Sequence, residues 1–358
     1  MVGLLGLVGL VFLSSFGLTR LLCSPASRLY LLDHPNERSL HVSPLPRTGG
    51  LAILGSVLLG IVASLAVGTG SALQTDATLW ILGMALLIGA VSFWDDRAGL
   101  SPALRLGVHA LAAAGVVWGA GLTVNTIAVP FIGSLPLGWL TTPVTILFLM
   151  WMANLYNFMD GMDGFAGGMT VLGYGFLGFL AWRGGHHHLM ALALLIGTAA
   201  SGFLFYNLPP ARIFMGDVGS IPLGFIAAAL AVMGTRDGLF DIWVPLLIFS
   251  PFAMDATVTL FRRLLRGEKV WRAHREHYYQ RLVLAGWGHR RTMLAEYALM
   301  LACGATAVAY GRAGEPVRLT ILLGWMGVYL LLARGVRRVE GQAQAAGAAG
   351  CQTLRFPP

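Results

Sequence analysis

The sequence contains few charged residues. Only 11% of its 358 residues are Asp, Glu, Lys or Arg, whereas a soluble globular domain carries about 25%. Hydrophobic residues make up 56%, so the chain lacks the polar groups needed to cover itself with a water-solvated surface. This composition excludes an ordinary soluble domain and indicates that lipid surrounds most of the chain.

Cysteine is also scarce. Cys23, Cys303 and Cys351 are far apart and form no CxxC pair, which argues against a zinc site and against a disulfide framework. The HExxH motif of a metalloprotease is absent as well. The net charge of +8 would suggest nucleic acid in a soluble protein, but here cytoplasmic loops and anionic lipid explain it, so no nucleic-acid partner is expected.

Long hydrophobic runs are abundant, and a membrane-spanning helix needs about 20 mostly apolar residues. The first run has no basic residue before it and is therefore interpreted as a span and not as a signal peptide. The sequence predicts about eleven spans, near residues 2–22, 49–67, 78–95, 103–120, 137–155, 164–182, 187–205, 218–234, 241–261, 292–311 and 316–334.

The predicted fold class is an all-α integral membrane protein, a polytopic bundle of about eleven transmembrane helices with catalytic cytoplasmic loops. Residues 1–340 are expected to form one domain, with segment 122–135 as a short extended or amphipathic piece outside the membrane. Residues 341–358 are small and polar, which predicts a disordered cytoplasmic tail.

The positive charges are divided unequally between the two sides. Of 24 Lys and Arg residues, 20 fall in the loops after odd-numbered spans or in the tail. Because cytoplasmic loops are enriched in Lys and Arg, the N-terminus is expected outside and the C-terminus in the cytoplasm. The expected location is the inner (plasma) membrane of a bacterium, with many crossings and an active site on the cytoplasmic face.

Acidic residues gather at the predicted cytoplasmic ends of the spans. They come from three different loops and are Asp95, Asp96, Asp160, Asp163 and Asp217. Ionised groups at membrane depth are costly and usually functional, although any one of them alone could be a helix-end charge or cap. A transporter would instead place carboxylates near the midplane on broken helices, often with inverted repeats, and no repeat is evident.

Two of these clusters favour a divalent cation. The adjacent carboxylates of Asp95 and Asp96 repel each other, and a metal or a basic partner would relieve that conflict. A second group recurs every three residues and so lies near one face of a helix, namely Asn154, Asn157, Asp160 and Asp163. Such oxygen-rich sites suit Mg²⁺, which keeps several waters and bridges substrate phosphates.

The third cluster combines Arg212 with Asp217, which has glycine on its N-terminal side and again two residues later. Arg212 could hold a phosphate bidentately, or it could form an ion pair with a nearby Asp, and Asp217 could be a further metal ligand. Two loops add basic and aromatic candidates for binding substrate, which are Arg38, His41, His274, His277 and Arg281. The last of these loops, from 271 to 291, could alternatively be a basic amphipathic stretch on anionic headgroups.

Together these motifs resemble the polyprenyl-phosphate N-acetylhexosamine-1-phosphate transferases (glycosyltransferase family 4), which start bacterial O-antigen, teichoic-acid and peptidoglycan lipid intermediates. The matched stretches run in order from Asp33 to about Arg291, and 154–164 and 207–220 are specific. The resemblance implies transfer of sugar 1-phosphate from a UDP-sugar to undecaprenyl phosphate within the lipid bilayer, with release of UMP. It also implies dependence on Mg²⁺, for which Mn²⁺ could substitute.

The resemblance implies roles for particular residues. Asp95 and Asp96 would be the paired aspartates, and Asp217 the main Mg²⁺ ligand, with Asp95 as a second. Asn157, Asp160 and Asp163 would be active-site residues.

One departure bears on the branch of the family. The last loop has His277-Tyr278-Tyr279-Gln280 where the family often has HxHH, which looks like the O-antigen branch that uses 6-deoxy-N-acetylhexosamines. The peptidoglycan enzyme, a phospho-MurNAc-pentapeptide transferase, is the alternative, and a homodimer is one open oligomeric state.

Overall fold

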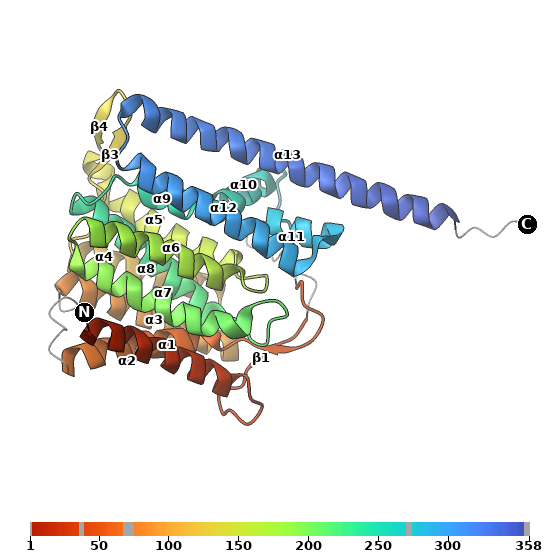
Figure 1. Ribbon diagram of the computed structural model, residues 1–358, viewed down its shortest axis with the longest axis horizontal. Coiled ribbons are helices and arrows are strands. Elements are labelled where there is room, and N and C mark those ends of the chain that lie inside the picture. The colour runs from red at the N-terminus through yellow and green to blue at the C-terminus, as the bar shows by residue number, and fades with distance from the viewer. Residues whose placement is uncertain (1, 36–38, 67–74, 270–273, 354–358) are drawn as a thin grey trace, which may run out of the picture.

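The computed structural model describes residues 2–35, 39–66, 75–269 and 274–353. Its long helices lie side by side in a bundle, with two short antiparallel strand pairs in the connections at its ends (Figure 1). From the N-terminus the elements are α1 (Val2–Leu22), β1 (Leu32–Asp33), β2 (Leu45–Pro46), α2 (Gly49–Ala66), α3 (Asp76–Ala98), α4 (Pro102–Gly119), β3 (Thr126–Val129), β4 (Gly133–Pro136), the 3₁₀ turn Gly138–Leu140, α5 (Thr141–Phe158) and α6 (Phe165–Arg183). The second half contains α7 (His187–Asn207), α8 (Asp217–Arg236), α9 (Trp243–Ile248), α10 (Ser250–Leu265), α11 (Tyr278–Leu282), the π-helical turn Val283–Trp287, α12 (Gly288–Tyr310) and α13 (Glu315–Thr353).

Ten helices among the described residues are long and apolar enough to cross a membrane. This confirms the predicted all-α polytopic class. The predicted span 241–261 is absent from the ten because it is broken at Phe249 into α9 and α10. Pro251 explains the break, since it has no backbone N–H to continue the helix of α9 and instead occupies the first turn of α10. The two short helices together account for the remaining predicted span.

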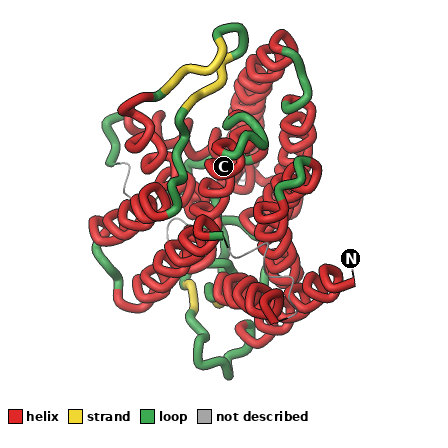
Figure 2. Tube along the Cα trace, turned by 90° about the vertical axis from the view of Figure 1, so that its left-hand side faces the viewer, coloured by secondary structure: helices red, strands yellow, loops and turns green. Residues whose placement is uncertain are grey.

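Two segments outside the spans were assigned from the sequence. The expected extended piece at 122–135 is the β3–β4 hairpin, which lies at the edge of the bundle (Figure 2). The expected tail differs, because α13 continues through Gly341 to Thr353 where the sequence predicted disorder. Five alanines between 343 and 349 favour helix at this end, so the helix of the last span extends beyond it.

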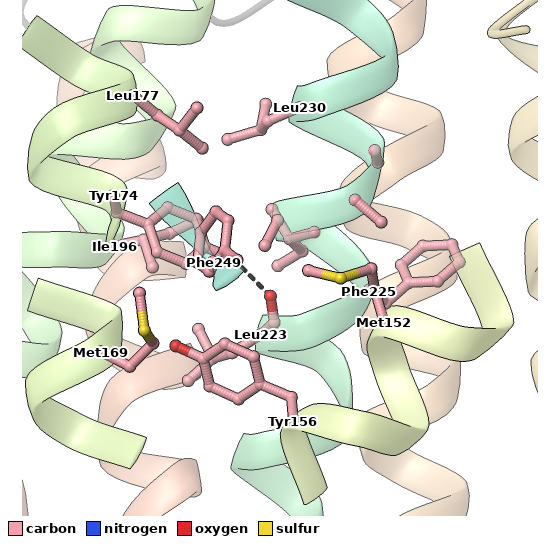
Figure 3. Packing of buried hydrophobic residues seen from close by; sticks show 14 of the residues in the cluster. Met152, Tyr156, Met169, Tyr174, Leu177, Ile196, Leu223, Phe225, Leu230 and Phe249 are labelled. Atoms are coloured by element: carbon pink, nitrogen blue, oxygen red, sulfur yellow. Dashed lines mark hydrogen bonds between the residues drawn. The ribbon is translucent and has the colours of Figure 1, made fainter. Parts of the chain in front are cut away.

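Helix α8 is the central element of the bundle. All of its residues from Val218 to Gly234 are buried, and it packs against α2, α3 and α5. Its sequence is apolar around the whole circumference, as expected for a helix surrounded by others. Gly224 lets α5 approach closely, because a Cβ there would lie 2.4 Å from the Met152 carbonyl oxygen. The hydroxyl of Tyr174 donates to the Leu223 carbonyl next to this contact (Figure 3).

The first turn of α8 is fixed by the chain that precedes α2. Phe214 N donates to the Pro46 carbonyl (2.7 Å), and Gly50 N donates to the Met215 carbonyl (2.8 Å). The backbones then meet at two glycines, because a Cβ on Gly50 would lie 2.3 Å from Gly219 Cα. Asp217 lies inside this contact region, so the start of α2 determines where its backbone sits. We call this end of the bundle, where α11 and β1 also lie, the Asp217 end (Figure 1).

The glycine contact predicts a selective loss of stability. Gly50→Ala forces backbone against backbone and should destabilise the purified protein by about 1–3 kcal/mol, measured by thermal unfolding in detergent. Gly55→Ala on the same helix is the control, because its Cβ would meet only Leu18 Cδ1 at 3.9 Å. Equal melting temperatures for the two variants would contradict this account of the packing.

Candidate active site

The Asp217 end of the bundle brings together three connections that carry the predicted acidic residues. They are the end of α3, the α5–α6 connection and the α7–α8 connection. The β1–β2 segment lies against the last of these through the hydrogen bonds of Pro46 and Gly50 described above. Residues as far apart in the sequence as Pro46 and Phe214 therefore share one small region.

The Asn and Asp residues that recur every three positions at the end of α5 face the first turn of α8. Asp160 Oδ2 accepts from Gly216 N (3.1 Å), and Asn157 Oδ1 accepts from Ser220 Oγ (3.2 Å). Asp217 occupies the first turn of α8, where unpaired backbone N–H groups and the helix dipole favour a carboxylate. The predicted residues Asn157, Asp160 and Asp217 are thus neighbours.

Asp163 joins the connections to one another. Its Oδ2 accepts from Ala211 N (3.0 Å), and its Oδ1 is paired with His289 Nδ1 (3.0 Å) from α12. Asn207 acts in the same way, since its Oδ1 accepts from Gly164 N (3.0 Å) and its Nδ2 donates to the Ile213 carbonyl (2.8 Å). These contacts assign Asp163 the role of holding the loops in position. His289 was not predicted, because nothing local in the sequence links it to a partner 126 residues away.

The two adjacent aspartates of α3 point to different partners. Asp95 Oδ2 pairs with Arg105 (2.9 Å), and its Oδ1 accepts from Leu100 N (2.6 Å), so both oxygens are occupied where α3 turns into α4. Asp96 instead faces Arg47, whose Nη1 lies 3.3 Å from Asp96 Oδ1. Asp96 Oδ2 is buried and has no hydrogen-bond partner among the described residues. Of the pair, Asp96 is therefore the residue that lies on the side of Asp160 and Asp217. We call these three side chains together the carboxylate group.

Arg47 lies beside Asp96 and Asp33 in this region and was not among the predicted site residues. Its Nη2 donates to the Asp96 carbonyl (2.9 Å), and its Nη1 lies 3.9 Å from Asp33 Oδ1. The predicted residue His41 lies beside the same aspartate, with Nε2 3.6 Å from Asp33 Oδ2, and its ring packs against Phe214. The one usable signal for Arg47 was its position directly before Thr48-Gly49-Gly50.

Negative charge is concentrated here. Burial and the nearby Asp217 carboxylate raise the pKa of Asp160 well above its usual range, against the lowering effect of the Gly216 N–H. The carboxylates of Asp217 and Asp33 are also close enough to repel that of Asp96. A cation bound among these carboxylates would favour their ionised forms.

The donor set fits a hard divalent cation better than a structural zinc ion. Asp96, Asp160 and Asp217 supply only carboxylate oxygens, and the buried Asp96 Oδ2 is available as a ligand. No three His, Cys, Asp or Glu side chains among the described residues converge closely enough to enclose a metal alone. Mg²⁺ needs no such cage, since it is commonly held by one or two carboxylates together with water and substrate phosphates.

Two other predicted residues, Asn154 and Arg212, lie around this group. Asn154 is one turn deeper in α5, where its Nδ2 donates to the Met150 carbonyl (2.7 Å) and lies 3.3 Å from His109 Nδ1. Arg212 is exposed and forms no ion pair with any acidic residue that the structure describes, which removes the alternative of a salt bridge to a nearby Asp. Arg38 lies outside the described residues.

The predicted residues of the last loop lie in two different places, the two histidines beside α5 and α10 and Arg281 beside α13. His277 is buried, with its Nδ1 3.1 Å from Asp255 Oδ1 and its ring stacked near Phe158 at the end of α5. His274 packs against it, and burial together with His277 and Arg263 lowers the pKa of His274 to about 4. His274 is therefore neutral at pH 7.

Arg281 points elsewhere. Its guanidinium pairs with Glu340 of α13 and covers the Tyr278 ring, so it does not join the carboxylate group.

Comparison with known proteins decides the family. Residues 78–235 match the family model described as Glycosyl transferase family 4. A Bacillus subtilis (strain 168) protein named "Probable undecaprenyl-phosphate N-acetylglucosaminyl 1-phosphate transferase" is 33% identical over 277 residues, covering 76% of this chain and 75% of the relative. The chain belongs to the polyprenyl-phosphate N-acetylhexosamine-1-phosphate transferase family.

Two further relatives show the breadth of this transferase family. The decaprenyl-phosphate N-acetylglucosaminephosphotransferase of Mycobacterium tuberculosis (strain ATCC 25618 / H37Rv) is 31% identical over 303 residues, covering 76% of this chain and 74% of the relative. The phospho-N-acetylmuramoyl-pentapeptide-transferase of Shouchella clausii (strain KSM-K16) is 30% identical over 265 residues, covering 70% and 79%. The protein is thus a multi-pass membrane transferase.

The different partners of the paired aspartates predict a pattern of coupling. In a double-mutant cycle, Asp95→Asn and Arg105→Gln should lower the melting temperature non-additively, because either change alone removes the same ion pair. Asp96→Asn combined with Arg105→Gln is the matched control and should be additive. Additive losses for Asp95 and Arg105 would show that the pair does not form in the protein.

Proposed function

We propose that the protein transfers N-acetylhexosamine 1-phosphate from a UDP-sugar to undecaprenyl phosphate and releases UMP. The observation that carries this proposal is geometric: at one end of the helical bundle, Asp96 faces Arg47 and Asp160 accepts a hydrogen bond from Gly216, the residue before Asp217. The names of the relatives support the reaction class, since two of those described are named as transferases of N-acetylglucosamine phosphate with a polyprenyl phosphate.

The chemistry accounts for the types of residue in the site. The attacking phosphate monoester has a second pKa of about 6, so it is largely ionised at pH 7 and does not need a strong base. The main obstacle is repulsion between this anion and the pyrophosphate of the donor. One phosphoanhydride bond forms as another breaks, so the reaction requires no separate energy source.

The residues of the chain can reduce that repulsion. Asp217 and Asp96 would hold Mg²⁺, which supplies charge neutralisation and electrophilic activation when bound. Asp160 would complete the acidic group, and Mn²⁺ would substitute because an oxygen-donor site accepts both ions. Arg212, exposed at the edge of the same connection, would contact a donor phosphate through its planar guanidinium.

We further infer that the site opens to the cytoplasm of a bacterium, where UDP-sugars are made. The support is the concentration of Lys and Arg in the loops at the Asp217 end. The last loop departs from HxHH, and this favours the O-antigen branch and a donor without a peptide, including a 6-deoxy sugar. The pentapeptide transferase is the second candidate, since one relative carries that name.

A donor panel tests the reaction. Purified protein with undecaprenyl phosphate and Mg²⁺ should release UMP from at least one UDP-N-acetylhexosamine and form a lipid-linked sugar, measured with radiolabelled donor. EDTA should abolish the activity, and Mg²⁺ or Mn²⁺ should restore it. Activity that survives exhaustive chelation would refute the metal mechanism, and activity with UDP-MurNAc-pentapeptide alone would favour the second candidate.

A carboxylate substitution tests the site. Asp217→Asn should reduce turnover by at least about a hundredfold, because it removes a charged ligand while keeping the size of the side chain. Asp76→Asn is the matched control at the first turn of α3, at the opposite end of the bundle, and should retain full turnover. Both variants should unfold within a few degrees of the wild type. Full activity of Asp217→Asn with Mg²⁺ present would overturn the assignment.

A further inference from the structure

A second polar site lies at the Asp217 end, in a groove beside α13. The groove has a volume of about 620 Å³ and is lined by the end of α10, the chain before α11, the end of α11 with the π-helical turn that follows it, and the extension of α13. Figure 1 shows α13 continuing past the other helices at this end. The charged lining consists of Arg262, Arg266, Arg275, Glu276, Arg281 and Glu340.

Helix α11 separates the groove from the carboxylate group. Tyr279 and Gln280 are buried, and the Tyr279 hydroxyl donates to the Phe158 carbonyl (3.2 Å) at the end of α5. Arg281 and Tyr278 face the other way and belong to the groove side, where Arg281 pairs with Glu340. A ligand in the groove would therefore lie across α11 from Asp160 and Asp217.

The groove has more positive than negative charge. Glu276 pairs with Arg262 and Arg266, and Glu340 pairs with Arg281, so four guanidinium groups face two carboxylates. The neighbouring residues Arg263 and Glu268 belong to the same network of ion pairs. Because one is positive and the other negative, counting them leaves the same excess of two positive charges.

Several donors in the groove also lack acceptors. Arg275 is exposed and has no ion-pair partner among the described residues. Arg262 Nε and Arg281 Nη1 are buried and make no hydrogen bond within the described part of the chain. The acidic residues present are already shared among several arginines, so an additional anion would pair with the exposed Arg275 and offset part of the excess positive charge.

We propose that this groove binds the phosphate group of an anion at a site separate from the carboxylate group. Guanidinium groups bind phosphate oxygens through paired, charge-assisted hydrogen bonds. The wall formed by α13 is uncharged at Ala343 and Gln344, so it adds no repulsion. Because the groove lies where α13 extends beyond the membrane-spanning bundle, the phosphate can belong to a phospholipid headgroup or to a soluble phosphate monoester.

The test adds one negative charge to the groove wall. Full-length, delipidated protein in a neutral detergent is titrated with phosphatidylglycerol or phosphatidylcholine, and bound lipid is counted by native mass spectrometry. A parallel titration with glycerol 3-phosphate is followed by thermal shift. Ala343→Glu should weaken binding of phosphatidylglycerol, of glycerol 3-phosphate or of both by about tenfold. The arm that responds identifies the source of the phosphate.

Two matched variants control for size and net charge. Ala343→Gln has the same size as the test variant without its charge, and Gln342→Glu adds the same charge one residue away from the lining of the groove. Both should bind as the wild type does, and so should Asp217→Asn, which tests this site independently of transfer. Equal binding by Ala343→Glu and Gln342→Glu in both arms would overturn the proposal. A raised KM for the UDP-sugar in Ala343→Glu alone would show that the groove belongs to the donor site.

Discussion

The contact between the start of α2 and the start of α8 supports the rest of the site. Gly50 and Gly219 bring two backbones together, and hydrogen bonds from Phe214 and Gly50 fix the direction of the chain between them. Because α8 is buried on all sides, its first turn cannot shift without disturbing the helices around it. The position of Asp217 is consequently set by the packing of the whole bundle.

The acidic group depends on this rigidity. Asp160 is linked to the residue before Asp217 through the Gly216 N–H, and Asp163 holds the α7–α8 connection against α12 through Ala211 and His289. Like charges held this close repel one another, and the raised pKa of Asp160 reflects that repulsion together with burial. A bound cation would offset this repulsion and favour the ionised carboxylates.

Helix α13 contrasts with α8, since few of its residues are buried within the chain. It is attached at separate points. Arg318 pairs with Asp241 near its start, the Tyr329 hydroxyl contacts Ser250 at the break between α9 and α10, and Glu340 pairs with Arg281 at the Asp217 end. The break at Phe249 is thus one of the places where α13 contacts the rest of the protein, and the contact at Glu340 lies in the wall of the basic groove.

The sequence by itself determined the class of fold, the approximate spans and most of the acidic group. The length of a hydrophobic run is a local property that can be read from the sequence. The clustered Asn and Asp residues of 154–164 can likewise be recognised without a structure, because oxygen-rich clusters of this kind are typical of Mg²⁺ sites. It did not predict the break at Phe249 or the helical extension beyond Gly341. From the sequence, Pro251 was equally compatible with a kink in one continuous helix. The tail was predicted to be disordered from its small and polar residues, although its alanines favour helix.

Only the tertiary structure decided which partners individual residues contact. Asp95 and Asp96 are adjacent and chemically identical, yet one pairs with Arg105 and the other faces Arg47, because successive residues of a helix point about 100° apart. Arg281, a candidate for substrate binding, pairs with Glu340, and Asp163 is paired with His289. Asp95 and Arg105 are ten residues apart, but the other partners are 49 to 126 residues apart, and the packing of the helices determines which of those meet.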